Sequence, residues 1–333
     1  MQRYRLAAVI LNGAMLMGAA AGAHAATFCV NSSLGLAIAL SVAQSNGEDD
    51  TINLEVGNYM LGGELMYNAA DSETHRLSII GGQVSGCGVY ASSGSTVLDG
   101  QNAVRILTIA AKGEVDIGRL TFQHGHPSQY AGGALNLSNA SAAPTYIFSS
   151  VFIANTDSIT AGAMYVSSTG DVYLWSNLVF ANTGPTALYF YDGANTYLTG
   201  NTIVGNQFNT MAVGALDPTG SGPYYLSNNI IWSNENADVF DQSGLVDYAY
   251  NDIGVIANAP PHSASHELSV DPGFNGFFSV SLAPDSPLVN AGDDNPPGGP
   301  GGCCDPSGDP RIVGTHVDIG AYESDVLLRT GFQ

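Results

Sequence analysis

Four short segments decide the fold: Ser150–Asn155 reads SVFIAN, Asn177–Asn182 reads NLVFAN, Asn201–Asn206 reads NTIVGN and Asn229–Asn234 reads NIIWSN. A looser fifth copy, Arg119–His124 (RLTFQH), precedes them, and the closing positions of the five copies are 31, 27, 24 and 28 residues apart. A recurring period in this range is the signature of a stacked repeat architecture.

Each repeat contains short strands and no helix. A second short strand recurs between the copies, at Gly133–Leu135, Gly162–Met164, Ala187–Tyr189 and Gly214–Leu216. Runs of β-branched and aromatic residues alternate with Gly, Asn and Ser, and this pattern excludes helical solenoids. A β-propeller is also excluded, because each of its blades needs about 40–50 residues and these repeats are shorter. The sequence therefore predicts an all-β, single-stranded right-handed parallel β-helix, with one coil per repeat and about 4.8 Å between coils.

The recurring Asn residues predict side-chain ladders at the corners of the coils. One column is Asn155, Asn182, Asn206 and Asn234, and a second is Asn177, Asn201 and Asn229. Asn tolerates the backbone of sharp corners, and identical residues stack in successive coils. We therefore interpret these residues as structural, and we place His124 at the equivalent position of the fifth copy.

The two ends of the chain differ from the repeats. Residues 1–25 have the basic start, apolar run and A-x-A site of a signal peptide cleaved after Ala25, which predicts a secreted or cell-surface protein. Residues 26–333 then form the β-helix domain, with a lid helix at about 33–45, regular coils at about 100–245 and an irregular closing segment at 247–333. In the helix we expect Leu34, Ala37, Ile38 and Ser41 or Val42 to share the apolar face. We interpret residues 293–310 as a long exposed loop.

Charge and cysteine content restrict the class of protein further. The chain has 29 acidic and 8 basic residues, and the mature chain would carry a net charge of −23. This negative charge excludes a nucleic-acid-binding protein, which needs a basic surface. No apolar run after residue 25 is long enough for a membrane span. We expect the protein to be a monomer. Four Cys in an exported chain favour disulfides, with Cys29 and Cys87 the preferred pair. Adjacent Cys303 and Cys304 form either a vicinal bridge or bonds to other partners.

The motifs at both ends resemble a known family. Phe28–Val30, Gly81-Gly82, Thr96–Gly100 and Leu120–Gln123 resemble the start of secreted bacterial right-handed parallel β-helix proteins with the pectate-lyase-like fold. Asp271–Phe274, Ser286–Gly292, Asp309–Arg311 and Val317–Glu323 resemble the closing segment of the choice-of-anchor Q type. The resemblance implies the fold and export, and only loosely implies carbohydrate contact or surface adhesion.

No catalytic site is predicted. A uronate lyase of this fold needs a basic residue to take the proton, yet no Lys or Arg occurs between Arg119 and Arg311. A hydrolase needs two facing carboxylates, and Asp157 and Asp192 are the pair that could approach each other across coils. His124 and His126 make at most a weak metal site. The sequence predicts no cofactor. Asp49-Asp50 and Asp293-Asp294 could contribute to a Ca²⁺ site, but neither pair has the spacing of a defined Ca²⁺-binding loop.

One aromatic column stands out. Tyr146, Tyr173, Tyr197 and Tyr225 each lie nine positions before a closing Asn, and each is followed by Ile or Leu. Because side chains alternate across a strand, an inward aliphatic column places the Tyr column outside, with Phe148 and Trp175 on the same face. The rings either stack for stability or form a platform for sugar rings. The candidate carbohydrate-binding residues are Tyr146, Tyr173, Trp175, Tyr197 and Tyr225.

These observations favour an exported, non-catalytic protein that binds a neutral glycan or acts in cell-surface adhesion. The alternatives are a glycoside hydrolase acting on a neutral polysaccharide and a rigid structural spacer of the envelope.

Overall fold

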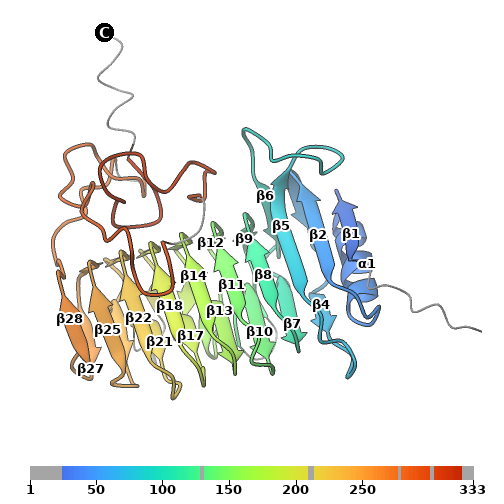
Figure 1. Ribbon diagram of the computed structural model, residues 1–333, viewed down its shortest axis with the longest axis horizontal. Helices are drawn as coiled ribbons and strands as arrows, with labels where there is room; N and C mark the ends of the chain where they lie inside the picture. Colours follow the sequence, from blue (N-terminus) through green and yellow to red (C-terminus); the bar gives the residue numbers. More distant parts are fainter. Residues whose placement is uncertain (1–24, 128–130, 209–213, 277–278, 301–303, 325–333) are drawn as a thin grey trace, which may run out of the picture.

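The computed structural model describes residues 25–127, 131–208, 214–276, 279–300 and 304–324, which form a parallel β-solenoid built from three sheets (Figure 1). In successive coils the chain visits sheet 1, sheet 2 and sheet 3 in turn, and all the paired strands of these sheets run parallel. The predicted parallel β-solenoid is confirmed. The predicted signal peptide lies outside the described residues, apart from Ala25.

Sheet 1 has ten strands and forms the face seen at the front of Figure 1. Its strands are, in order, β1 (Ala26–Val30), β2 (Asp50–Glu55), β5 (Leu77–Gln83), β8 (Val115–Gly118), β11 (Thr145–Phe148), β14 (Val172–Trp175), β18 (Thr196–Thr199), β22 (Tyr224–Ser227), β25 (Val246–Ala249) and β28 (Ser263–Ser265). The coils therefore continue beyond Asp247, where the repeat in the sequence fades.

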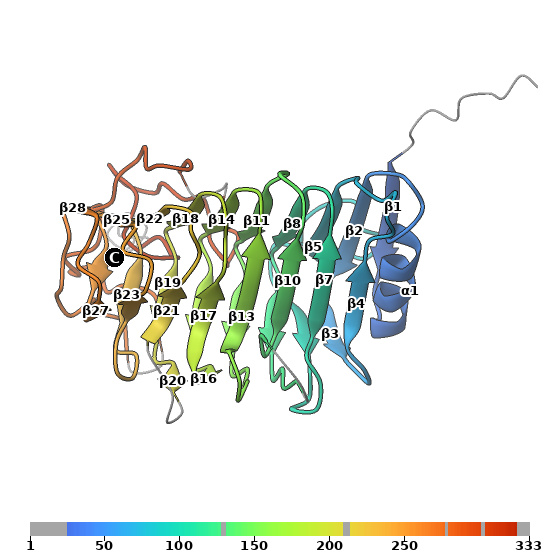
Figure 2. The same ribbon diagram turned by 90° about the horizontal axis from the view of Figure 1, so that it is seen from below.

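Sheets 2 and 3 have eight strands each and complete the coils (Figure 2). Sheet 2 consists of β3 (Gly57–Met60), β6 (Thr96–Asp99), β9 (Thr121–Gln123), β12 (Val151–Ile153), β15 (Leu178–Phe180), β19 (Thr202–Val204), β23 (Ile230–Trp232) and β26 (Asp252–Ile253). Sheet 3 consists of β4 (Leu65–Asn68), β7 (Leu107–Ala111), β10 (Leu135–Asn139), β13 (Ala161–Ser168), β17 (Thr186–Phe190), β21 (Gly214–Pro218), β24 (Val239–Asp241) and β27 (Ile256–Asn258). A small two-stranded sheet pairs β16 (Thr183–Gly184) with β20 (Gln207–Phe208).

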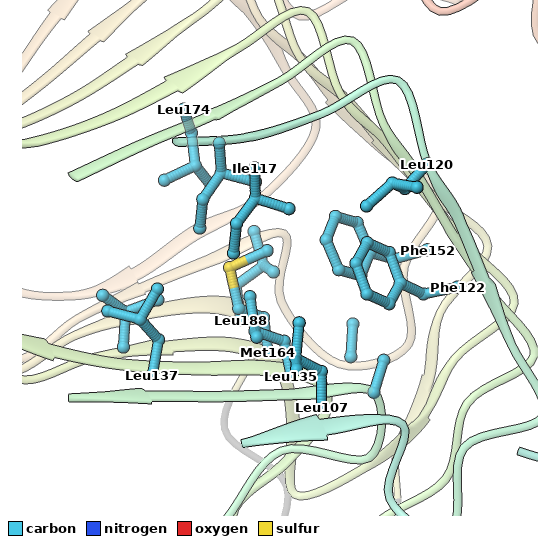
Figure 3. Close-up of a cluster of buried hydrophobic side chains, with 14 of the residues drawn as sticks. Leu107, Ile117, Leu120, Phe122, Leu135, Leu137, Phe152, Met164, Leu174 and Leu188 are labelled. Carbon is cyan, nitrogen blue, oxygen red and sulfur yellow. The ribbon is translucent and has the colours of Figure 1, made fainter. Parts of the chain in front are cut away.

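The hydrophobic core runs along the inside of the coils as columns of stacked side chains. In sheet 1 the inward column is Ile52, Ile79, Ile117, Ile147, Leu174, Leu198 and Leu226, all of them buried. In sheet 2 the rings of Phe122 and Phe152 stack with their centroids 4.7 Å apart (Figure 3). Because each coil repeats the same inward positions, the interior is one continuous apolar column.

Both predicted Asn ladders are present. In the first, Nδ2 of Asn155, Asn182 and Asn206 donates to Oδ1 of the next Asn, ending at Asn234, over 2.8–3.0 Å. In the second, Asn177, Asn201 and Asn229 donate in the same way over 2.9–3.0 Å, and the ladder extends to Asn251. The Asn residues are therefore corner residues of the coils, as predicted.

The fifth copy lies one residue out of the predicted register. Thr121 pairs with Val151 and Gln123 with Ile153, so the position equivalent to Asn155 is Gly125 and not His124. The backbone N–H of Gly125 donates to Asn155 Oδ1 over 2.8 Å. His124 instead has a positive φ and bonds Asp99 through Nδ1, so its placement in the ladder was wrong.

Helix α1 (Ser33–Ala43) lies beside β1, β2 and β4 at the N-terminal end (Figure 2). Its bounds agree with the predicted helix, and Ser32 Oγ accepts from the N–H of Gly35 as its N-cap. The predicted buried face was wrong: Leu36, Ala39, Leu40 and Ala43 are buried, whereas Leu34, Ile38 and Val42 are exposed. The helix is apolar nearly all round, so its sequence does not single out the face that the neighbouring strands cover. Among the described residues, no helix has the length and apolar character needed to cross a bilayer.

A disulfide joins Cys29 of β1 to Cys87 in the loop after β5 and closes a separation of 58 residues, as predicted. The loop between β5 and β6 rises above the coils (Figure 1). Through Tyr90 it borders the groove over sheet 1 that is described in the next subsection. Cys303, the neighbour of Cys304, lies outside the described residues.

The segment after β28 folds back over the corner between sheets 1 and 2 (Figure 1). Leu282, Leu288 and Ile319 pack on Val204 and Ile230, which point outward from sheet 2. Polar contacts continue along the corner, where Asn228 Nδ2 donates to Asp293 O over 2.8 Å and Ser149 Oγ donates to Cys304 O over 2.7 Å. The interpretation of residues 293–310 as an exposed loop was therefore wrong, because Pro296 and Asp305 are buried and the segment bonds the coils through Asp293 and Cys304.

Candidate functional site

The four predicted Tyr residues lie in one column on the outer face of sheet 1. Tyr146, Tyr173, Tyr197 and Tyr225 are register partners on β11, β14, β18 and β22. Their ring centroids are 4.8, 4.9 and 5.0 Å apart, and successive planes differ by 17°, 12° and 12°. The following Ile or Leu of each strand points into the core. The column is therefore an outward stack of half-buried rings.

Trp175 widens one end of this column. Its ring centroid lies 5.3 Å from that of Tyr146 and 5.2 Å from that of Tyr173, and the ring is tilted against both. Burial of the Tyr173 ring, with the nearby Asp171 carboxylate, raises the pKa of the phenol to about 12. The Tyr173 phenol therefore stays neutral and keeps its capacity to donate and accept hydrogen bonds at physiological pH.

A groove begins where the Tyr column meets the first coils. It has a volume of about 660 Å³ and lies over β2, β5, β8, β11 and β14. Its residues are Thr51, Asn53, Arg76, Ser78, Ile80, Tyr90, Glu114, Asp116, Tyr146, Phe148 and Trp175. Hydroxyl and amide groups thus lie on the floor, and four aromatic rings lie beside them.

Arg76 holds the two acidic side chains of the groove. Its Nε lies 2.6 Å from Asp116 Oδ2 and 3.2 Å from Glu114 Oε1. Asp116 is the register partner of Tyr146, so the charged cluster continues the line of the Tyr column. Burial raises the pKa of Asp116, and the hydrogen bond and charge of Arg76 act in the opposite direction. The three groups offer both donors and acceptors to a polar ligand.

The other end of the Tyr column is partly covered. A Cβ added to Gly298 would lie 2.6 Å from Cγ of Tyr197, so this part of the C-terminal segment rests directly on the Tyr197 ring. A Cβ added to Gly299 would lie 4.0 Å from Cζ2 at the edge of the Trp175 indole, so Gly299 does not rest on this ring. The part of the column that borders the groove is thus Tyr146 with Trp175, and Tyr197 also supports the C-terminal segment.

The carboxylates suggested for a hydrolase do not form a pair. Asp157 follows β12 of sheet 2 and accepts hydrogen bonds from the N–H groups of Gly132, Thr160 and Ala161. Asp192 follows β17 of sheet 3, a different corner of the coil, and accepts from Ser168 N–H and Thr196 Oγ1. Both side chains are buried. In the described structure, the two carboxylates accept hydrogen bonds from N–H and hydroxyl groups at the corners of the coils.

The candidate metal ligands do not gather into one site. His126 is exposed, and His124 pairs with Asp99. Within the described ranges, three side chains able to bind a metal meet at Cys29, Glu55 and Cys87, but the two sulfurs there are joined in the disulfide. Asp293 and Asp294 hold local backbone N–H groups of the C-terminal segment.

Sequence reasoning missed Tyr90 and the Arg76 cluster. Asp116 lies nine positions before Gly125, so the correct register of the fifth copy extends the Tyr column to this acid. Arg76 and Tyr90 lie outside the repeats, and no periodic signal marks them. Comparison of the chain with protein families, with curated proteins and with solved structures finds no match.

Proposed function

We propose that this chain is an exported, non-enzymatic β-solenoid protein that binds neutral glycan on the outer face of sheet 1. The observation that carries the proposal is the junction of Tyr146 and Trp175 with a groove containing hydroxyl, amide and charged groups. Sugar recognition needs an apolar face for the ring and convergent hydrogen-bonding groups for the hydroxyls. Both are present along one surface.

The repeat of the surface suits an extended chain of sugars. The Tyr rings recur every 4.8–5.0 Å along the solenoid, close to the length of one sugar unit. With 29 acidic and 8 basic residues, the chain repels a polyanion. A neutral glycan avoids this repulsion, and we expect its binding to depend only weakly on salt.

Export is part of the proposal. It rests on the leader pattern in residues 1–25 and on the Cys29–Cys87 disulfide, which is typical of an oxidising compartment. We also infer kinship with the choice-of-anchor Q proteins and their pectate-lyase-like fold, and this inference rests on the motifs at the two ends of the chain, such as Val317–Glu323.

A glycan array screened with the purified mature protein, with and without Ca²⁺, tests the proposal. For a neutral oligosaccharide found there, Trp175→Ala and Tyr146→Ala should each weaken binding about five- to tenfold, because each removes a stacking contact of about 1–1.4 kcal/mol. Tyr191→Ala is the matched control, since Tyr191 is 60% exposed and lies outside sheet 1.

Three outcomes would overturn the proposal. Equal binding by wild type and both groove variants would place the ligand elsewhere. Release of products from a polysaccharide would favour the hydrolase, and an array without any ligand would favour the spacer. Tyr197→Ala is a poor probe, because its ring supports Gly298 and its loss would disturb the C-terminal segment as well.

A further inference from the structure

Arg119 differs from the other cations of the described chain. Arg76, Arg105, Lys112 and Arg311 each lie within 3.2 Å of a carboxylate oxygen. Arg119 has no such partner among the described residues, and its guanidinium N–H groups have no acceptor there. In a chain with 29 acidic residues, an arginine without a carboxylate is exceptional.

Three segments hold the Arg119 guanidinium in place. Its central carbon lies 4.3 Å from the centroid of the Tyr90 ring, a cation–π contact. Gly82 and Gly308 approach it from β5 and from the C-terminal segment, and a Cβ on them would lie 3.2 Å from Nε and 2.8 Å from an Nη atom. The charge is thus fixed in position before any ligand arrives, which lowers the entropy lost on binding.

A polar cavity of about 300 Å³ adjoins Arg119. It lies between the loop after β5 and the C-terminal segment, at the corner between sheets 1 and 2. Its lining includes five hydroxyl residues: Ser93, Ser95, Thr121, Ser149 and Ser307. Ser149 Oγ donates to Cys304 O, which leaves its oxygen able to accept. A fixed guanidinium with surrounding hydroxyls matches the oxygens of a carboxylate or sulfate group.

We propose that this cavity, which we name the Arg119 pocket, binds a single oxyanion group, a carboxylate or a sulfate ester, carried by a sugar. Tyr90 lines the groove of sheet 1 and stacks on Arg119, which lines the cavity, so this pair of side chains connects the pocket with the groove. A glycan with one acidic residue places that residue in the pocket and its neutral sugars on Trp175 and Tyr146. This extension into the groove rests on the proposed function; the pocket itself does not.

Isothermal titration with glucuronate, glucose and inorganic sulfate tests the pocket separately from the groove. Wild type should bind glucuronate or sulfate and not glucose, and the affinity should fall as ionic strength rises. Arg119→Gln should weaken binding of the anion at least about tenfold, and Arg119→Lys should weaken it less, because it keeps the charge but loses the planar fork. Lys112→Gln, which removes a cation already paired with Asp71, is the matched control and should leave binding unchanged.

The probes also separate the two possible anions and the two proposals. Binding of glucuronate assigns a carboxylate, and binding of sulfate alone assigns a sulfate ester. Loss of anion binding in Arg119→Gln but not in Trp175→Ala supports the pocket even if no neutral glycan binds the groove. The pocket is refuted if wild type binds neither anion, or if Arg119→Gln and Arg119→Lys, both folded by their melting curves, bind as wild type does.

Discussion

Removal of the Asn182 side chain tests the ladder that holds the coil corners. Asn182 is fully buried, and its Nδ2 donates to Phe152 O over 2.9 Å and to Asn206 Oδ1 over 3.0 Å. Its Oδ1 accepts from the backbone N–H and from Nδ2 of Asn155 over 3.0 and 2.9 Å. One side chain therefore connects three successive coils.

The expected cost follows from the groups left without partners. After Asn182→Ala, the backbone N–H of Asn155, one hydrogen of its amide and the carbonyl of Phe152 lose their partners in a buried corner. Each unsatisfied buried group costs about 1–3 kcal/mol, and partial relaxation reduces the sum. We therefore expect the free energy of unfolding to fall by about 3–6 kcal/mol, with a similar loss for Asn206→Ala, whose contacts are equivalent.

Chemical denaturation followed by far-UV circular dichroism measures this loss. Asn58→Ala is the matched control, since Asn58 is an exposed Asn on β3 and its removal should change the stability by less than about 0.5 kcal/mol. Asn182→Asp keeps the shape but puts an acceptor against Phe152 O and Asn206 Oδ1, so it should also destabilise. Midpoints equal to wild type for both Asn182→Ala and Asn206→Ala would refute the ladder.

Two further predictions concern the ends of the solenoid. Replacing Cys29 and Cys87 with Ala should lower the free energy of unfolding by about 3–4 kcal/mol, because the bridge spans 58 residues; peptide mapping that finds both thiols free would contradict it. Burial raises the pKa of Glu267 from its ordinary 4.5 to about 7, so its contribution to stability is complete below about pH 4.5 and is lost as the pH rises to about 7. Glu267→Gln keeps the acceptor for Asn251 but cannot ionise. Between about pH 4.5 and 7, the melting temperature of this variant should therefore fall less than that of wild type. Parallel plots of melting temperature against pH for the two proteins would exclude the effect.

The features that the sequence predicts correctly are those that repeat. A position that recurs in each coil stacks on its own copies, so the Asn ladders and the Tyr column follow from counting along the chain. The alternation of Tyr146 with Ile147 then fixes which column points outward once the core is known to be aliphatic. The two-residue alternation along each strand and the repeat from coil to coil therefore both predict that the Tyr side chains form one outward column.

The prediction fails where a copy diverges or where distant segments meet. In the fifth copy, Leu120, Thr121 and Phe122 are all compatible with a strand, so the sequence alone allowed a shift by one residue, and the shift concealed Asp116 as a member of the column. Arg76 and Tyr90 reach the groove from outside the repeats. Their positions depend on long-range contacts that leave no period in the sequence.

The C-terminal segment changes how the Tyr column is interpreted. A column that serves stability alone needs no access to solvent, and Tyr197 beneath Gly298 fits that role. Tyr146 and Trp175 differ, because they border a groove that also contains hydroxyl, amide and charged side chains, and packing stability does not require such neighbours. The same stack of rings therefore has a covered end and an open end. Variants at the two ends should separate loss of folding stability from loss of glycan binding.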